Sequence, residues 1–162
     1  MSQIVVKAIH NNFRNTFGLM RDTIRNFDDE NWRKEYTWFL VPVRVAYHNI
    51  ECVDFYFRDL DASFTWGYRF GGPYWETPND EQPSQGELLA YLDELEARVA
   101  TCFDAMEDEE LGDTYDETGE QPMTKISHYA YALRHTVHHQ GTLAALADIL
   151  GVQSTDWDKY AD

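Results

Sequence analysis

Three of the six histidines of this sequence stand within five positions, in the stretch LRHTVHHQGTLAAL at residues 133–146. His135 and His139 are four residues apart, so on a helix their rings lie on the same face, one turn apart. Such a pair can chelate a divalent cation, because neutral imidazole is a strong ligand for zinc, nickel and iron(II). His138 falls about 60° to one flank of this face, and its i, i+3 pairing with His135 is a weaker alternative.

A third inward histidine is predicted on a separate helix. His48 shares a helical face with Val45, Cys52 and Phe55, and three protein ligands would leave one metal position open for water or substrate. The alternative interpretation is that the HHQ stretch is helix surface and His48 a hydrogen-bonded core residue. The shared inward face favours the metal site.

Other reactive groups are weaker candidates. The sequence contains no E-x-x-H, no H-E-x-x-H, no phosphate-binding glycine loop and no G-x-S-x-G motif. Glu51, one turn after His48, is either a general base or a carboxylate that orients a ligand, or else a solvated helix residue, and the solvated reading is favoured. Cys52 and Cys102 are expected to be buried, reduced thiols rather than a disulfide or a zinc knuckle.

Composition limits the class of protein. The 162 residues include 13 basic and 29 acidic side chains, a formal net charge of −16, which would repel nucleic acid and anionic lipid. Aromatic residues at 15% and hydrophobic residues at 43% indicate a folded chain, which we interpret as a single domain over residues 1–162. The N-terminal stretch offers neither a signal peptide nor a membrane span, so a cytoplasmic location is expected.

Helical periodicity predicts four helices, and hence an all-α fold. The first runs up to Phe27 and ends at the acidic stretch DDEN, and the second has Pro42 in its first turn. The third opens with a Ser84/Glu87 capping box. The fourth starts near Pro122 or Thr124 and runs to Leu150, followed by Gly151 as a left-handed terminator.

The two faces of the fourth helix are both apolar. The face centred on His135 is expected to be the core side, and it also carries His128, Tyr131, Ala132, Thr142, Leu146 and Ile149. The opposite face carries Ile126, Leu133, Val137 and Ala144. It must be covered by a second copy of the chain or by the chain's own termini, and a homodimer is slightly favoured.

Two long connections join these helices. Residues 63–83 are rich in glycine, proline and aromatic residues, and a loop of this length in a compact domain is usually functional. One interpretation is that part of a cleft wall is formed by Trp66, Tyr68, Phe70, Tyr74 and Trp75. The alternative, that these rings plug one end of the bundle or cover the dimer seam, is the commoner fate of aromatic side chains and is favoured. Residues 108–122 are expected to form a solvent-exposed acidic loop. The predicted fold is an up-down four-helix bundle with a long crossover between helices 2 and 3.

The stretches YHNIECVDFYF around His48 and LRHTVHHQGTLAALADILG around His135 and His139 resemble the DinB-like bundles, which are grouped with bacillithiol S-transferases and mycothiol-dependent maleylpyruvate isomerases. The resemblance covers the whole chain. The family pattern commonly reads H-x-x-x-H-R-G-Q, whereas Gln140, Gly141 and Thr142 follow His139 here. The ligand positions match, whereas the arginine and the glutamine of the pattern do not.

The resemblance implies a divalent metal (zinc, nickel or iron) held by His48, His135 and His139, frequently in a homodimer. Transfer of a low-molecular-weight thiol is the best-described chemistry of such bundles. We therefore expect a metal-dependent enzyme that joins a small thiol to an electrophile. The alternative is a non-catalytic metal-containing binding or stress-associated module.

Overall fold

A computed structural model describes residues 2–116, 122–153 and 155–157 of the chain. The elements follow one another as α1 (Ile4–Asn26), α2 (Asp29–Trp32), α3 (Pro42–Tyr56), α4 (Gln85–Asp104), the 3-10 helix η1 (Asp108–Gly112), β1 (Thr114–Tyr115), β2 (Met123–Thr124) and α5 (Lys125–Ile149). The all-α prediction is therefore confirmed, with one two-stranded hairpin in addition.

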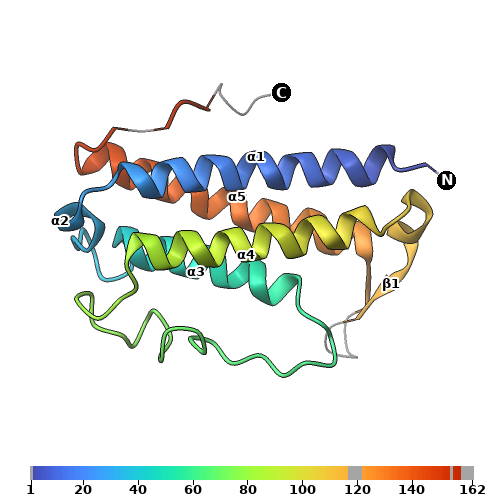
Figure 1. The fold of residues 1–162 in the computed structure, drawn as a ribbon, viewed down its shortest axis with the longest axis horizontal. Helices are drawn as coiled ribbons and strands as arrows, with labels where there is room; N and C mark the ends of the chain where they lie inside the picture. The colour runs from blue at the N-terminus through green and yellow to red at the C-terminus, as the bar shows by residue number, and fades with distance from the viewer. Residues whose placement is uncertain (1, 117–121, 154, 158–162) are drawn as a thin grey trace.

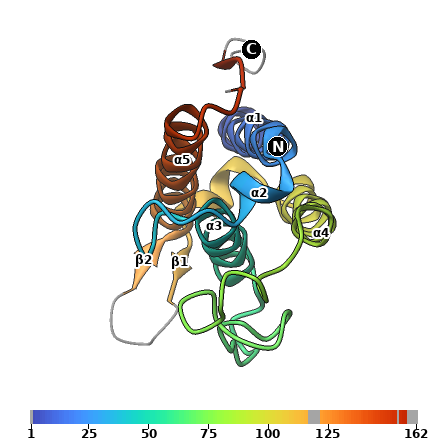
Figure 2. The same ribbon diagram turned by 90° about the vertical axis from the view of Figure 1, so that its left-hand side faces the viewer.

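The four long helices form a bundle, and the crossover between α3 and α4 runs back along its side (Figure 1). Seen end-on, α1 and α4 lie on one side, α5 on the other, and α3 sits between α4 and α5 (Figure 2). Because the crossover returns along the full length of α3, helices α3 and α4 point the same way, while α1 and α5 point the other way. None of the helices in the described ranges is long and apolar enough to cross a membrane.

The predicted helix ends are largely confirmed. Pro42 begins α3, where its missing N–H has no helical partner to lose. The Ser84 and Glu87 side chains form the reciprocal capping box at the start of α4. The Thr124 side chain accepts a hydrogen bond from the Ser127 N–H at the start of α5, and Gly151 takes the left-handed conformation after its end, with φ +71°.

Two features of the connections between the long helices were not predicted by periodicity. The residues after Phe27 do end α1, but Asp28 caps the amide of Asn31 and thereby starts the short helix α2. The acidic loop contains η1 and β1 and is only partly exposed, since Leu111 is buried. Residues 117–121 of this loop lie outside the described residues.

The core fills the space between the four long helices. Its largest fully buried side chains include Trp32, Tyr47, Tyr91, Phe13, Phe17 and Phe103. On α5, His128, Ala132 and Leu146 face inward as predicted. Tyr131 and Ile149 were expected on the same side but are 46% and 54% exposed. The buried face of α5 also includes Thr136, Leu143 and Ala147, so it is centred to one side of His135, whereas Tyr131 and Ile149 lie about 40° to the other side.

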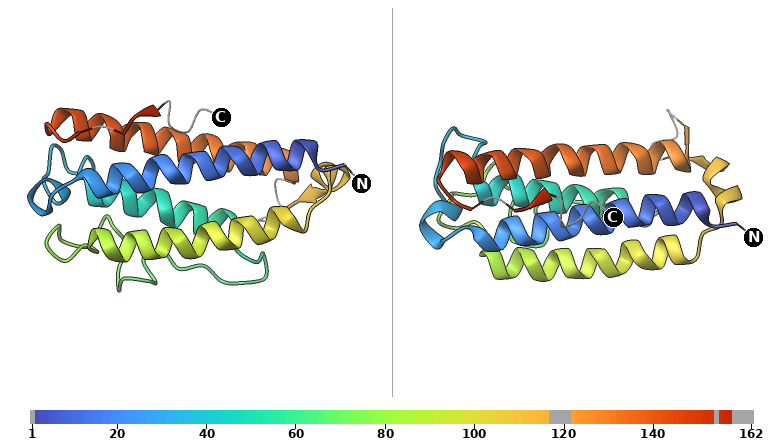
Figure 3. Two further views of the ribbon diagram at one scale, coloured as in Figure 1. Left: turned by 45° about the horizontal axis from the view of Figure 1, so that its top comes forward. Right: turned by 90° about the horizontal axis from the view of Figure 1, so that it is seen from above.

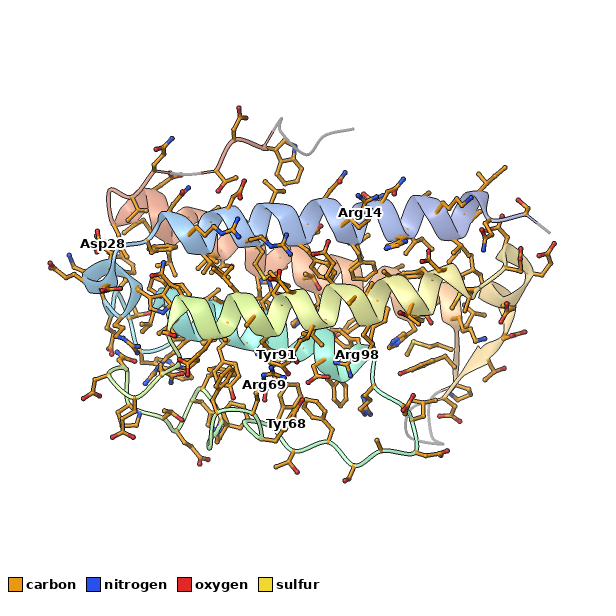
Figure 4. All side chains as sticks on the ribbon, in the orientation of Figure 1. Arg14, Asp28, Tyr68, Arg69, Tyr91 and Arg98 are labelled. Carbon is orange, nitrogen blue, oxygen red and sulfur yellow. The ribbon has the colours of Figure 1, made fainter. Side chains whose placement is uncertain are left out.

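The crossover is attached to α3 by three side chains spaced along one stripe of that helix. The Tyr47 hydroxyl donates to the Gly72 carbonyl, the Glu51 carboxyl accepts from the Gly67 N–H, and the Asp54 carboxylate accepts from the Tyr68 hydroxyl. Tyr91 and Arg98 of α4 also donate to Asp54. Figure 4 shows Tyr68, Tyr91 and Arg98 gathered between the crossover and α4. The segment is therefore packed structure rather than a free linker.

Candidate metal centre

The three predicted ligands meet where α3 packs against α5, and Figure 3 shows these two helices side by side. His48 comes from the middle of α3, and His135 and His139 from the middle of α5. The Asn49 side-chain amide donates to the Thr136 carbonyl at 3.0 Å, next to the histidines, and fixes the two helices relative to each other. All three imidazoles are half-buried.

The rings are mutual neighbours. His48 Nε2 lies 3.1 Å from His139 Nε2. The ring centroids are 5.3 Å apart for His48 and His135, and 4.5 Å apart for His135 and His139. The structure thus brings together the residues that the i, i+4 spacing and the inward position of His48 predicted.

Burial keeps these imidazoles neutral. It lowers the pKa of His48 to about 4, with a smaller contribution from the neighbouring His135. Burial also lowers the pKa of His139 to about 3, and the field of the other histidines adds to this effect. The pKa of His135 is lowered for the same main reason. At neutral pH each ring therefore carries a free nitrogen lone pair, the form in which histidine ligates metals.

The donor set fits a divalent cation. Tetrahedral zinc with Zn–N bonds of 2.0–2.1 Å places two ligating nitrogens roughly 3.3 Å apart, close to the 3.1 Å between the Nε2 atoms of His48 and His139. The Nδ1 atoms of His135 and His139 are buried without a hydrogen-bond partner among the described residues. A cluster of neutral imidazoles with unused nitrogens is the environment in which a bound cation is stabilised.

Aromatic side chains cover the sides of the cluster. Phe39, from the segment before α3, packs edge-on against both His48 and His139. Tyr74 of the crossover lies 5.0 Å from His48, centroid to centroid. Of the five crossover aromatics predicted to wall a cleft, Tyr74 is the one that the described ring contacts place against a predicted ligand.

The other four crossover aromatics pack elsewhere. Trp66 stacks on Phe55, and Phe70 packs edge-on against Tyr47. Tyr68 is held by Asp54. Trp75 contacts Tyr74 and reaches the cluster only through it. Tyr68 and Trp75 are 55% and 41% exposed, so these rings lie along the side of α3 rather than against the predicted ligands.

Cys52 is a nearby donor that sequence reasoning assigned to the core alone. Its Sγ atom lies 3.6 Å from His48 Nδ1 and 3.8 Å from His48 Nε2. The donor atoms of His48, Cys52 and His135 all lie within 4.8 Å of one another, so this group could hold a metal ion. The signal was present in the sequence as a second i, i+4 pair, His48 and Cys52, facing the histidine pair of α5. Both cysteines are free thiols, as predicted.

Glu51 corrects the prediction of a solvated helix residue. Its side chain is fully buried, and one carboxyl oxygen accepts from the Gly67 N–H while the other has no partner among the described residues. Burial raises the pKa of Glu51 to about 7, against the opposing effect of the Gly67 hydrogen bond. The side chain binds the backbone of the crossover and does not face solvent.

The remaining residues of the histidine stretch have separate roles. His138 is exposed on the flank, as the helical geometry predicted. His128 is buried, stacks on Tyr115 and donates to the Tyr56 carbonyl, so it is a structural residue. Gln140, in the position of the family's arginine, is buried and donates to the Thr23 hydroxyl of α1 at 2.9 Å.

Comparison with known proteins agrees with this architecture. No curated protein matches the chain. One family model matches residues 1–162, which is the whole chain, and its description is the DinB family. On the strength of this match over its full length, the chain belongs to the DinB family of metal-binding helical proteins.

Proposed function

We propose that this protein is a divalent-metal-dependent transferase, in which His48, His135 and His139 hold the cation and a small thiol is joined to an electrophile. The observation that carries the proposal is the convergence of three neutral imidazoles from two helices, with 3.1 Å between two of their Nε2 atoms. Family membership supports metal binding. The thiol and the electrophile remain part of the proposal.

The chemistry follows from the donor set. A free thiol has a pKa of about 8.5 and is mostly protonated at neutral pH, whereas a bound divalent cation deprotonates a thiol that coordinates it. Phe39 and Tyr74 flank His48 with apolar ring surface. Their role is to shield the reacting sulfur from water, which strengthens electrostatic interactions at the site.

A second function is favoured by one observation. Cys52 stands close enough to His48 and His135 to act as a further protein donor, and a metal with four protein ligands is characteristic of structural sites. The protein would then be a non-catalytic, metal-containing binding or stress-associated module. The two functions share the metal and differ in whether an external thiol reaches it.

Metal binding is tested on protein purified without a histidine tag. We expect one equivalent of zinc, nickel or iron per chain by elemental analysis. His139→Ala should greatly reduce the metal content, because it removes one of three converging imidazoles. His138→Ala is the matched control, since this neighbour is exposed, and it should leave the metal content nearly unchanged. Equal losses in the two variants would refute the ligand assignment.

Transfer is tested separately on the metal-loaded protein. The initial rate of reaction between 2-mercaptoethanol and a chromogenic aryl halide is measured with the native chain and with His139→Ala. The transferase predicts acceleration by the native chain that the variant loses. If the native chain binds its metal stoichiometrically but does not accelerate the reaction with this or other thiols, the transferase is refuted. The non-catalytic module is then the function that agrees with the data.

A further inference from the structure

Cys52 occupies the same position relative to His48 that His139 occupies relative to His135. Both pairs have i, i+4 spacing, so each helix presents two donors one turn apart. The two helices pack against each other, and the donor atoms of His48, Cys52 and His135 lie within 4.8 Å of one another. His139, which is outside that group, approaches His48. Cys52 is buried, with 3% of its surface exposed, so its sulfur points into this contact rather than toward solvent.

The distances around Cys52 match those of a metal-bound sulfur. With Zn–S near 2.3 Å and Zn–N of 2.0–2.1 Å, tetrahedral geometry separates sulfur and nitrogen by roughly 3.6 Å. Cys52 Sγ lies 3.8 Å from His48 Nε2. The same His48 nitrogen is the one that approaches His139. His48 therefore links the sulfur on its own helix to the imidazole on α5.

We propose that Cys52 is a further ligand of this metal centre, supplying a thiolate from α3 opposite the histidines of α5. The proposal rests on the metal binding stated above, but not on thiol transfer. It changes the donor set from three nitrogens to three nitrogens and one sulfur. It also explains why a cysteine occupies this buried position beside the imidazoles. For packing alone, an aliphatic side chain would serve equally well.

A thiol that coordinates a divalent ion does so as the thiolate. Metal uptake through Cys52 would therefore release a proton that a site without Cys52 would not release.

A sulfur donor restricts both the metal and its external ligands. Thiolate favours zinc over magnesium or manganese, whose preferred ligands are oxygens. Four protein donors leave a small ligand only a fifth position, which zinc sites adopt transiently. Removing Cys52 should therefore admit 2-mercaptoethanol to the metal more readily.

The competing role for Cys52 is that of a hydrogen-bond acceptor. Sγ lies 3.6 Å from His48 Nδ1, and a ligating histidine commonly donates its second N–H to a neighbouring acceptor. In that case the sulfur would orient the ring without touching the metal. Spectroscopy separates the two roles, because only a direct sulfur–metal bond gives ligand-to-metal charge transfer.

The experiment loads the untagged protein with cobalt(II) and records its absorption spectrum. We expect one equivalent of cobalt and a near-ultraviolet sulfur-to-cobalt charge-transfer band. Cys52→Ser and Cys52→Ala should both abolish the band while keeping cobalt bound through the histidines. Cys102→Ser is the matched control, because Cys102 lies on α4 beside Tyr129, and it should keep the band. Far-ultraviolet circular dichroism confirms that each variant is folded.

Each outcome decides the proposal. Loss of the band in both folded Cys52 variants, with cobalt retained, supports it. A native chain that binds cobalt without the band overturns the ligand role of Cys52 and leaves the histidine site intact. A native chain that binds no cobalt, zinc, nickel or iron overturns this inference together with the proposed metal function.

Discussion

The buried polar side chains of α3 fall into two groups, which lie on different faces of the helix and have different roles. His48 and Cys52 face α5 and form part of the candidate metal centre. Tyr47, Glu51 and Asp54 face the crossover and hold its backbone and side chains. Burying a polar group costs desolvation free energy, so each of these side chains needs a bonding partner that offsets the cost. The Nδ1 atoms of His135 and His139 have no such partner among the described residues, and the proposed metal centre lies at these rings.

Glu51→Ala should lower the free energy of unfolding by about 1–3 kcal/mol, because it leaves the buried Gly67 N–H without an acceptor. Glu51→Gln should cost less, since the amide oxygen still accepts that hydrogen bond. Urea unfolding of the two variants at neutral pH measures the difference. If glutamine costs as much as alanine, the Gly67 hydrogen bond is not the source of the effect.

The contrast between His48 and Glu51 shows what the sequence can predict at this level. The inward position of His48 follows from helical spacing alone, because its neighbours on the same face are apolar. Glu51 lies 60° to the side of His48 by the same geometry, so nothing local distinguishes it from a solvated residue at the edge of that face. Its burial depends on Gly67, sixteen positions further along the chain in an irregular segment. Such a contact leaves no periodic pattern in the sequence from which it could be predicted.

Among the elements, the crossover is the one whose conformation the sequence leaves most open. The four long helices follow from periodicity, caps and Pro42, which are local signals. The crossover instead depends on close backbone packing. Gly67 has φ +81°, and a Cβ atom there would lie 2.1 Å from the carbonyl carbon of Gly72. This contact folds the segment back on itself just before Tyr74, which reaches His48.

Gly67→Ala and Gly71→Ala form a matched pair that tests this packing. Both glycines have φ near +80°, but a Cβ at Gly71 would meet nothing within 4 Å. Gly71→Ala should therefore cost only the left-handed backbone penalty, about 1–2 kcal/mol. Gly67→Ala should cost clearly more, because the backbone of Gly72 and Pro73 must also move. Urea unfolding measures both, and equal losses would show that the close approach is not needed.

Over the whole molecule, a segment far along the chain completes the first helix. No side chain of α1 itself caps its N-terminus. Instead the Asp108 carboxylate of η1 accepts from the amides of Ile4, Val5 and Val6. These hydrogen bonds, the Val6 amide foremost, lower the pKa of Asp108. The positive end of the helix dipole adds a favourable interaction with the carboxylate.

Asp108→Asn should therefore speed amide hydrogen exchange at Ile4, Val5 and Val6. Because the folded state lowers the pKa of Asp108, its contribution is complete above the unfolded value of about 4 and is lost as pH falls through the lower, folded value. The native chain should lose this protection in acid, whereas the variant should not depend on pH in this window. Asp61→Asn, an exposed crossover substitution with the same change in charge, should leave these amides protected.

Assembly is the remaining property of the whole molecule, and we predict a homodimer through the outer face of α5. Ile126 and Val137 on that face are 40% and 38% exposed. The alternative cover, the C-terminal tail, reaches part of this face. The Thr155 hydroxyl hydrogen-bonds to Thr23 of α1, and the tail borders a cavity of about 290 Å³ lined by Val137 and Ala144. Ile126, near the other end of α5, lies outside that cavity lining.

Each copy carries a net charge of −16, so two copies repel each other. Added salt screens this repulsion. An apolar contact between such chains should therefore tighten as ionic strength rises, unlike one held by ion pairs. Light scattering at micromolar concentration should give a dimer mass whose fraction grows with added salt. Val137→Lys should shift the chain to monomer, because burying an unpaired ammonium in an apolar contact is unfavourable. Leu60→Lys, at an apolar crossover position that is 45% exposed, should leave the dimer unchanged. A monomer mass for the native chain at every salt concentration would contradict the dimer and leave the tail as the partial cover of α5.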